Sequence, residues 1–387
     1  MFKELDFMNL DSLLTPEELQ IKESVRKFVT KEYMPTVSEN FEKGHFDKSI
    51  IPKLGAMGLL GANLPEEYGC ANLNNISYGI INQELERGDS GLRSFASVQS
   101  ALVMYPIYAF GSEEQKKKWL PQLAAGEKIG CFGLTEPDHG SDPQSMITNA
   151  KDGGDHYILN GAKMWITNGS MSDIAIVWAK LDGDIRGFIV ETNLEGFTQP
   201  LIKDKYSLRA SITSELVFDN VKIPKDAILP NIKGIKGPLS CLTQARYGIA
   251  WGAIGAAQAC FDEALEYTKE RTQFGKPIAG FQLTQQKLAV IATEITKAQF
   301  MTYQLGKLKD AKKYTPSQVS MCKRNNVDMA LQTARTTRGM LGANGISSEY
   351  QSMRHMCNLE SVYTYEGTHE IHTLIVGMEL TGLAAFK

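Results

Sequence analysis

The chain has 387 residues, a formal net charge of −3, and 43% hydrophobic and 22% charged residues, which is an ordinary globular composition. This length exceeds what one hydrophobic core usually serves, so we expect several subdomains that share interfaces. Basic residues are interspersed with acidic ones, which argues against nucleic acid or an anionic membrane as the main partner.

The cysteines and the N-terminal stretch bear on the compartment. Six cysteines lie far apart without a CxxC pair, which indicates reduced thiols and not a disulfide scaffold. The start, MFKELDFMNLDSLLTPEELQ, is acidic and lacks both an apolar signal core and the composition of a transit peptide. We therefore expect a cytoplasmic protein, or one of the mitochondrial matrix if a presequence has been removed, with no membrane partner.

The residue pattern changes twice along the chain and divides it into three regions. From Thr15 to about Phe110 apolar residues recur at helical spacing, and TPEEL supplies a Thr cap with Pro and acids in the first turn. From about Gly130 to Pro224, short β-branched or aromatic runs alternate with Asn-Gly and Asp-Gly, which predicts a small antiparallel β domain. After Gly237 the helical period returns and predicts an antiparallel bundle. The predicted domains are residues 1–130, 131–236 and 237–387.

Several common site motifs are absent from the sequence. There is no GxGxxG and no GxxxxGK[ST], so the phosphate-binding loops of Rossmann and P-loop proteins are missing. GxSxG, the commonest serine hydrolase motif, is missing too. The pair in His369-Glu-Ile-His372 has the wrong spacing to place two imidazoles on one helical face for zinc. We therefore predict no metal site.

Three polar clusters lie far apart along the chain, and each has one ligand-binding and one structural interpretation. FGLTEPDHGSD, residues 132–142, offers hydroxyls and free N–H groups to a heterocycle, or is a capped turn. KMWITN, residues 163–168, presents Trp165 and Thr167 to one strand face, or buries a core Trp. ERTQFGKP, residues 270–277, places Arg271 to pair with a phosphate, or carries an ordinary surface arginine.

Two further stretches contain close glycines or charges. GMLGANG, residues 339–345, spaces three glycines so that a ligand, another chain or only a neighbouring helix can approach closely. GDSGLRSFASVQS, residues 88–100, holds Arg93, and Glu86 would be two turns away if one helix ran through both. A surface ion pair is the alternative there.

Together these clusters resemble the acyl-CoA dehydrogenase family from about Leu14 to Phe386. FGLTEPDHGSD, MWITNG, RTQFGKP, MLGANGIS and TYEGTHEIH are typical stretches of that family and stand in register. The resemblance implies an N-terminal helical domain, a middle antiparallel β-barrel and a C-terminal four-helix bundle, with FAD as cofactor and a homotetrameric assembly. GLRSFASVQSALVM, GCFGLTEPDHGSDP, ARYGIAWG and KRNN are most similar to the members that act on glutaryl-CoA.

The resemblance also implies which residues contact FAD. Near the isoalloxazine it places Phe132, Leu134, Thr135, Gly140, Ser141, Trp165, Ile166 and Thr167. At the adenine and pyrophosphate end, partly across a subunit interface, it places Arg271, Gln282, Gly339, Gly342 and Ala343. Further cofactor positions are Phe274, Thr368, His369 and Glu370. Gly339 and Ala343 depart from the residues usual in the family. For His369 and His372, capping and helix-surface roles are the alternative.

The chemistry implied by the resemblance centres on Glu366. Removing a proton from Cα requires a desolvated carboxylate, and the Glu of the YEG stretch is the family's base. Its N–H would bind the developing enolate oxygen. Glu370 would lie one helical turn away, and we expect only Glu366 to face the substrate.

The remaining implied substrate residues shape the acyl pocket and the CoA side. Arg93 would hold a distal carboxylate, because an unpaired buried guanidinium would be costly for an unbranched acyl group. The others are Glu86, which would orient Arg93, then Ser94, Ser97, Ser141, Tyr365, Gly367 and Arg246, the last on the CoA side.

The implied reaction oxidises and decarboxylates glutaryl-CoA to crotonyl-CoA and CO2, with electrons passed to electron-transfer flavoprotein. Alternatives within the same fold stop at glutaconyl-CoA, act on short-chain acyl-CoA, or use oxygen. A catalytically inactive acyl-CoA-binding scaffold is the alternative from another class.

Overall fold

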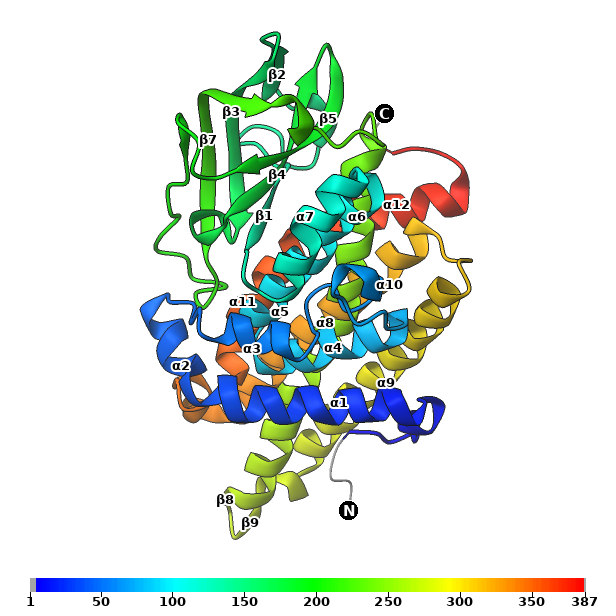
Figure 1. The fold of residues 1–387 in the computed structure, drawn as a ribbon. Coiled ribbons are helices and arrows are strands. Elements are labelled where there is room, and N and C mark those ends of the chain that lie inside the picture. Colours follow the sequence, from blue (N-terminus) through cyan, green and yellow to red (C-terminus); the bar gives the residue numbers. More distant parts are fainter. Residues whose placement is uncertain (1–4, 386–387) are drawn as a thin grey trace.

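Residues 5–385 are described by a computed structural model, in which a β-sheet region lies against one side of a body of helices (Figure 1). Residues 1–4 and 386–387, the outer limits of the first and third predicted domains, lie outside this range. The arrangement confirms the predicted order of helical, β and helical regions. The first region contains α1 (Pro16–Phe28), α2 (Met34–Lys43), α3 (Ile50–Ala56), α4 (Asn75–Gly88), α5 (Ser90–Ser97), the π-helical segment η4 (Val98–Met104), α6 (Tyr105–Phe110) and α7 (Glu113–Ala124).

Two local features of this region follow from its polar residues. Thr15 caps α1, since its hydroxyl accepts from Glu18 N while the Glu18 carboxylate accepts from Thr15 N, as TPEEL predicted. Asp89 separates α4 from α5 with extended backbone, φ −166° and ψ 142°. The condition of one helix through Glu86 and Arg93 is therefore not met, because Asp89 caps a new helix through Gly91 N.

The sheet is mixed and not wholly antiparallel as predicted. Its strands are β1 (Gly130–Gly133), β2 (Asn149–Asp152), β3 (His156–Thr167), β4 (Ile174–Leu181), β5 (Asp184–Glu191), β6 (Phe197–Thr198) and β7 (Thr213–Pro224). β1 and β2 both pair parallel to β4, whereas the β4–β5, β2–β3, β3–β7 and β6–β7 pairs are antiparallel. Turn signals identified the hairpins, but they carry no information on the long connections that make parallel pairs.

The C-terminal region is a bundle of long helices. It contains α8 (Lys236–Glu270), α9 (Gln282–Asp310), α10 (Pro316–Met340), α11 (Ser352–Thr364) and α12 (His369–Thr381), and the small hairpin of β8 (Thr272–Gln273) and β9 (Lys276–Pro277). α8, α9 and α10 pack on one another and α11 packs on α8 and α10, which gives the predicted four-helix bundle. α12 adds to it by packing on α10.

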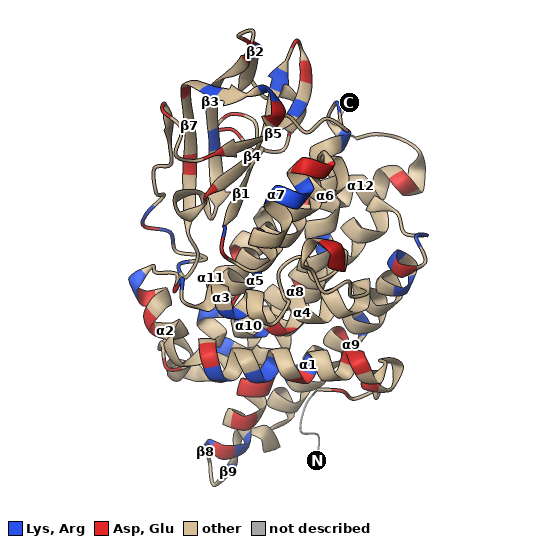
Figure 2. Cartoon of the chain, viewed as in Figure 1, with Lys and Arg blue, Asp and Glu red and all other residues tan. Residues whose placement is uncertain are grey.

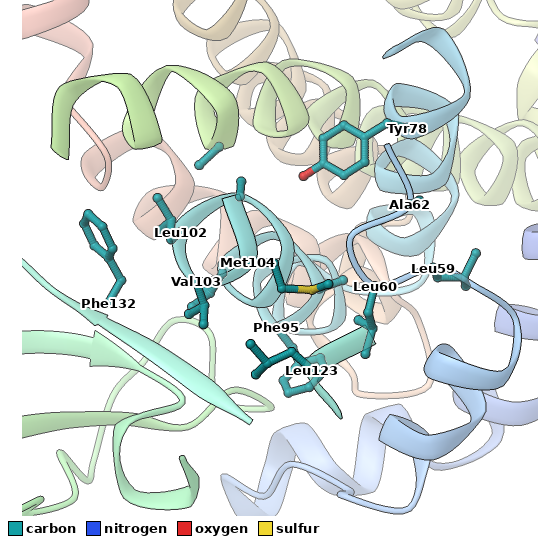
Figure 3. Close-up of a cluster of buried hydrophobic side chains, with 14 of the residues drawn as sticks. Leu59, Leu60, Ala62, Tyr78, Phe95, Leu102, Val103, Met104, Leu123 and Phe132 are labelled. Carbon is teal, nitrogen blue, oxygen red and sulfur yellow. The ribbon is translucent and has the colours of Figure 1, made fainter. Parts of the chain in front are cut away.

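The largest hydrophobic core joins the helical regions to one face of the sheet. Figure 3 shows Phe95, Leu102 and Leu123 of the helices in the same cluster as Phe132 of β1. A second cluster fills the C-terminal bundle, and a third lies on the other face of the sheet. Leu134, directly after β1, also belongs to the largest core, so the start of the loop after β1 packs against the helices.

Cysteines and surface charge agree with the composition. Each cysteine is a free thiol, and all but Cys357 are buried. Acidic and basic residues are intermixed over the helices and strands in the view of Figure 2. None of the helices within residues 5–385 combines the length and the apolar character that crossing a membrane requires.

Candidate active site

The turn Tyr365–Gly367, between α11 and α12, carries the predicted base. Glu366 has φ 52° and Gly367 has φ 94°, so two successive residues adopt left-handed backbone. Such strain in a non-glycine residue is typical of functional positions. The expected one-turn helical relation between Glu366 and Glu370 is wrong, because α12 begins only at His369.

The Glu366 carboxyl lies among cations and yet lacks a direct partner. Its Oε2 is buried, and no hydrogen-bond partner for it exists among the described residues. Burial raises the pKa of Glu366, and the charges of Arg93, Arg246 and Lys323 oppose that rise. A desolvated carboxylate with a free oxygen is a strong base that has not been neutralised by a neighbour.

A buried ion pair closes one side of this site. Arg93 of α5 donates through Nε to Glu86 Oε2 of α4 at 2.6 Å, and the two side chains are 1% and 0% exposed. Ser90 Oγ donates to the other Glu86 oxygen at 2.8 Å. The surface-pair alternative is therefore wrong. Although burial opposes it, Glu86 and Tyr365 keep the pKa of Arg93 above its ordinary value.

Tyr365 links this ion pair to the base. Its hydroxyl accepts from Arg93 Nη2 and lies 3.2 Å from Ser94 Oγ. The Arg93 guanidinium also lies over the Tyr365 ring, 5.7 Å from its centroid. The residue that precedes Glu366 is thus in contact with the guanidinium predicted to bind a distal carboxylate.

The backbone of α8 packs directly against the Arg93–Glu86 pair. A Cβ at Gly252 would lie 2.0 Å from Glu86 Oε2 and 3.2 Å from Arg93 Nε, so only glycine fits there.

Two buried hydroxyls in this region lack a hydrogen-bond partner among the described residues. They are Ser97 Oγ and Tyr78 Oη. Ser97 was predicted as a donor. Tyr78 was missed, because a tyrosine inside an apolar helix reads as core.

Arg246 lies under the base and faces inward. It is 8% exposed, and its Nε donates to the Glu366 carbonyl oxygen at 2.7 Å. A Cβ at Gly367 would lie 3.0 Å from Arg246 Nη2 and 2.9 Å from His372 Nε2. Gly367 therefore lets the turn pass close over these two side chains, and its left-handed φ adds a second reason for glycine.

The first residues of α12 divide into exposed and buried groups. Thr368 caps the helix by accepting from Ile371 N, and the His369 ring stacks on Tyr363 with centroids 4.5 Å apart. Glu370 is exposed, and main-chain and Thr368 hydrogen bonds lower its pKa. The helix-surface interpretation of His372 is wrong, because this side chain is fully buried. Burial and the nearby cations lower the pKa of His372 to about 2, so it is neutral.

The two segments predicted to line the isoalloxazine are joined to each other. Met164 N donates to Thr135 O at 2.8 Å. Beneath them, Lys163 Nζ donates to Glu136 Oε1 at 2.9 Å and to Leu134 O at 3.1 Å. Both side chains are buried, at 0% and 2% exposure. This buried pair was missed, since Lys163 occupies an ordinary polar position of the strand alternation.

The exposure of Trp165 tests whether a flat cofactor fits against these two segments. It sits in a β-bulge of β3 with φ 62°, and 58% of it is exposed although it is a large aromatic residue. Gly140 and Ser141 are also exposed, and Thr135 and Thr167 are half-buried. Exposed aromatic surface beside open loop hydroxyls fits a planar ring. The side chains of Phe132, Leu134 and Ile166 are buried, so a cofactor would contact these three residues through their main chain.

The residues predicted for the adenine end gather elsewhere. Arg271 and Phe274, the latter predicted as a further cofactor position, lie on or beside the β8–β9 hairpin, which projects from the side of the molecule opposite the sheet (Figure 1). Asn344 Nδ2 donates to Tyr267 Oη of α8 at 3.0 Å and thereby brings the Gly339–Ala343 segment to this end. Gln282, Gly339, Gly342 and Ala343 are exposed there. One chain does not bring the two halves of the predicted FAD site together.

We expect the Glu136→Gln variant to lose stability and FAD. One partner of a buried pair would be left charged, which typically costs about 3–5 kcal/mol. Denaturant unfolding and the flavin-to-protein absorbance ratio measure both effects. The double variant Glu136→Gln/Lys163→Met leaves no unpaired charge and should recover much of the stability. Equal losses in the single and double variants would contradict this role of the pair.

Among residues 5–385, no group of three His, Cys, Asp or Glu side chains is arranged to hold a metal ion. The arrangement is therefore a buried carboxylate base, an adjacent guanidinium and a separate surface that fits a flat ring. Such a site can remove a proton next to a carbonyl group while an oxidant takes a hydride.

The matches to known families cover nearly the whole chain. Family models described as Acyl-CoA dehydrogenase N-terminal, middle and C-terminal domains match residues 15–127, 131–221 and 233–381. The chain belongs to the acyl-CoA dehydrogenase family, whose members are FAD-dependent oxidoreductases that act on CH–CH bonds. Bound FAD supplies the acceptor for a hydride that leaves the acyl chain.

Individual relatives include enzymes for different acyl groups. A Mycobacterium smegmatis glutaryl-CoA dehydrogenase, solved in complex with FADH2, is 50% identical with a TM-score of 0.99, and the match covers 100% of both chains. A Desulfococcus multivorans glutaryl-CoA dehydrogenase is 34% identical, covering 97% of this chain and 99% of the relative. The Bos taurus short-chain specific acyl-CoA dehydrogenase is 35% identical, covering 95% and 91%. Similarity alone therefore leaves the acyl group open.

Proposed function

We propose that this acyl-CoA dehydrogenase oxidises and decarboxylates glutaryl-CoA to crotonyl-CoA and CO2, and passes the electrons to electron-transfer flavoprotein. The observation that carries the substrate assignment is Arg93, buried beside the base and connected to it through Tyr365. Glu86 accepts from Nε of this guanidinium and Tyr365 accepts from Nη2, so further N–H donors remain for a ligand. A dicarboxylic acyl group supplies a carboxylate that can accept from them.

The proton chemistry is assigned to Glu366. Its ionised carboxylate takes a proton from Cα of the acyl thioester, and the developing negative charge moves to the thioester oxygen. The Glu366 N–H, directed away from the buried cations, is the proposed main-chain donor to that oxygen. The side chain and the backbone of one residue therefore act on the two ends of the same enolate.

The distal carboxylate makes a second step available. Loss of the Cβ hydride, for which bound FAD would be the acceptor, first gives an α,β-unsaturated thioester that still carries the distal carboxylate on Cγ. The bond between Cγ and the carboxylate carbon then breaks, CO2 leaves, and the bonding electrons delocalise into a dienolate. The proton now on Glu366 returns to Cγ and gives crotonyl-CoA, so atoms and charge balance. Arg93 holds the carboxylate before this step, while Ser94 and Ser97 offer hydroxyls nearby. Ser141 is proposed to contact the substrate from the loop after β1.

We further propose that the enzyme works as a homotetramer with FAD bridging subunits. Large apolar side chains are exposed on the hairpin and around it, with Phe274 at 95%, Leu283 at 73% and Ile346 at 65%. Exposed apolar surface of this kind typically marks an interface. The predicted adenine-end residues lie in the same region, so a neighbouring subunit can supply them to the sheet-side site. The domain limits stay a prediction.

An anaerobic titration with glutaryl-CoA tests the proposed reaction. We expect bleaching of the flavin absorbance, followed by crotonyl-CoA as the mass-spectrometric product and one CO2 per FAD reduced. Glutaconyl-CoA as the end product would overturn decarboxylation while retaining the substrate. Bleaching by butyryl-CoA alone would overturn the substrate assignment and favour a short-chain enzyme. In air, peroxide formed at the rate of turnover would overturn the proposed electron acceptor.

A further inference from the structure

The carbonyl oxygens of three successive residues at the base turn are held by two buried cations. Lys323 of α10, which is 1% exposed, donates through Nζ to Tyr365 O at 3.1 Å and to Gly367 O at 2.9 Å. Arg246 of α8 donates to Glu366 O, which lies between them. The main chain of the turn is therefore hydrogen-bonded to two helices of the bundle.

This attachment determines where the amide hydrogens of the turn point. In a trans peptide unit the N–H is directed opposite to the C=O. Since the Tyr365 carbonyl is turned toward Lys323, the Glu366 N–H in the same peptide unit is turned away from it. Among the described residues, no acceptor is found for the N–H groups of Glu366 and Gly367. The inward cations thus keep two donors free on the substrate side.

We propose that Lys323 is a positioning residue for the base, whose ammonium group fixes the 365–367 turn and favours the ionised form of Glu366. This proposal rests on the proposed function of Glu366. The ammonium also polarises the Tyr365 carbonyl, and a polarised peptide unit is a stronger donor at its N–H. A chain of two hydrogen bonds then joins Lys323 to the thioester oxygen through one peptide unit.

The charges around Lys323 come from several elements. Glu366 in the turn, Arg93 of α5, Arg246 of α8 and the exposed Glu370 of α12 all act on it. The charge of Lys323 in turn helps to lower the pKa of His369 and of His372 in α12, and His372 is neutral at the pH values of interest. Glu366 is therefore the buried acid that compensates Lys323.

The protonation states of the two groups depend on each other. Burial lowers the pKa of Lys323 to about 7, and the Glu366 charge opposes this effect. Conversely, burial raises the pKa of Glu366 while the Lys323 charge opposes that rise. When Glu366 takes up the substrate proton, its negative charge is lost and new negative charge forms on the thioester oxygen. The cation then stabilises the enolate through the turn.

Three substitutions separate charge from geometry. Lys323→Gln keeps a donor and removes the charge, Lys323→Arg keeps the charge and changes the donor geometry, and Lys323→Met removes both. A matched control is Lys205→Met. Lys205 likewise donates to two carbonyls, Leu208 O at 3.0 Å and Ser211 O at 2.8 Å, in the loop before β7.

The experiment measures flavin reduction by stopped flow in the FAD-loaded enzyme, from acid to alkaline pH, with glutaryl-CoA and butyryl-CoA. Activity requires ionised Glu366, so loss of the cation should move the acid limb to higher pH in Lys323→Gln and Lys323→Met. Lys323→Arg should keep the limb but lose about 10²-fold in rate on both substrates, as expected for a misplaced base. Lys205→Met should leave the limb in place.

A second readout does not depend on turnover. The protonated carboxyl of Glu366 gives an infrared band that is identified by its absence in Glu366→Gln. We expect this band to persist to higher pH in Lys323→Gln than in the parent enzyme. An unchanged band and an unchanged acid limb in folded, yellow Lys323→Gln protein would overturn the role of Lys323. Flavin reduction that survives in Glu366→Gln would instead overturn the proposed base itself.

Discussion

Replacing Glu366 with Gln is expected to abolish flavin reduction while the protein stays folded and yellow. The substitution preserves the shape of the side chain and the main-chain donor but removes the proton acceptor. Loss of a general base typically costs about 10²–10⁴-fold, and burial of this carboxyl argues for the upper end. Stopped-flow reduction under anaerobic conditions with glutaryl-CoA measures the loss, and the flavin-to-protein absorbance ratio verifies that FAD is retained.

Glu360 provides the matched control for this substitution. It is an acidic residue six positions earlier in the chain, but it is exposed and lies on α11. Glu360→Gln should retain reduction within a few fold. A loss in Glu360→Gln as large as that in Glu366→Gln would contradict the assignment of the base to one carboxylate.

The pH profile of the parent enzyme checks the same assignment independently. Because burial raises the pKa of Glu366, the carboxylate form is gained only above the pH range of an exposed glutamate. The acid limb of kcat/KM should therefore lie above that of an exposed carboxylate, and rates should fall as the pH drops through it. A flat profile across the acidic range would contradict a buried base.

Replacing Arg93 with Gln is expected to change substrate preference as well as rate. Truncating one partner of a buried charged hydrogen bond costs about 2–5 kcal/mol, which corresponds to about 30- to 5,000-fold in kcat/KM on glutaryl-CoA. Butyryl-CoA has no carboxylate to lose and should be affected much less. The ratio of kcat/KM for the two substrates is the measurement, and equal losses would remove the carboxylate-binding role.

The unpaired Glu86 left behind by this change needs its own control. Arg93→Gln leaves Glu86 buried without its partner, which destabilises the fold whatever the substrate. The double variant Glu86→Gln/Arg93→Gln removes both charges and should regain stability in denaturant unfolding. If the preference against glutaryl-CoA persists in the double variant, it reports the missing guanidinium and not a damaged pocket.

The sequence predicted those parts of the fold that depend on local pattern. The cap at Thr15 and the apolar face of α9 follow from residue type and spacing, and both are present. The parallel pairing of β1 with β4 could not be predicted, because it joins strands separated by a long connection. The break at Asp89 was also missed, although an Asp before a small residue is a capping signal.

For the site, the sequence predicted residue types better than their surroundings. The resemblance singled out Glu366 and Arg93 in advance, but not the interior on which the turn rests. Lys323 looks like one more charged residue in the polar run KRNN, and His372 looks like a helix-surface residue. Burial made both of them parts of the site, and burial depends on the packing of α8, α10 and α12 together. No local pattern encodes that packing.

Asp89, the residue that interrupts α4 and α5, also ties the two ends of the acyl site together. Its fully buried carboxylate accepts from Gly91 N at 2.7 Å, and from Arg354 Nη1 and Asn358 Nδ2 of α11 at 2.8 Å each. α11 leads directly into the turn that carries Glu366. A shift at this junction would move Arg93, proposed to bind the distal carboxylate, and Glu366, the proposed base, at once. One buried carboxylate therefore supports both the helix that carries the proposed specificity residue and the helix that leads to the proposed base. We expect redesign of the acyl pocket to require that Asp89 stays in place.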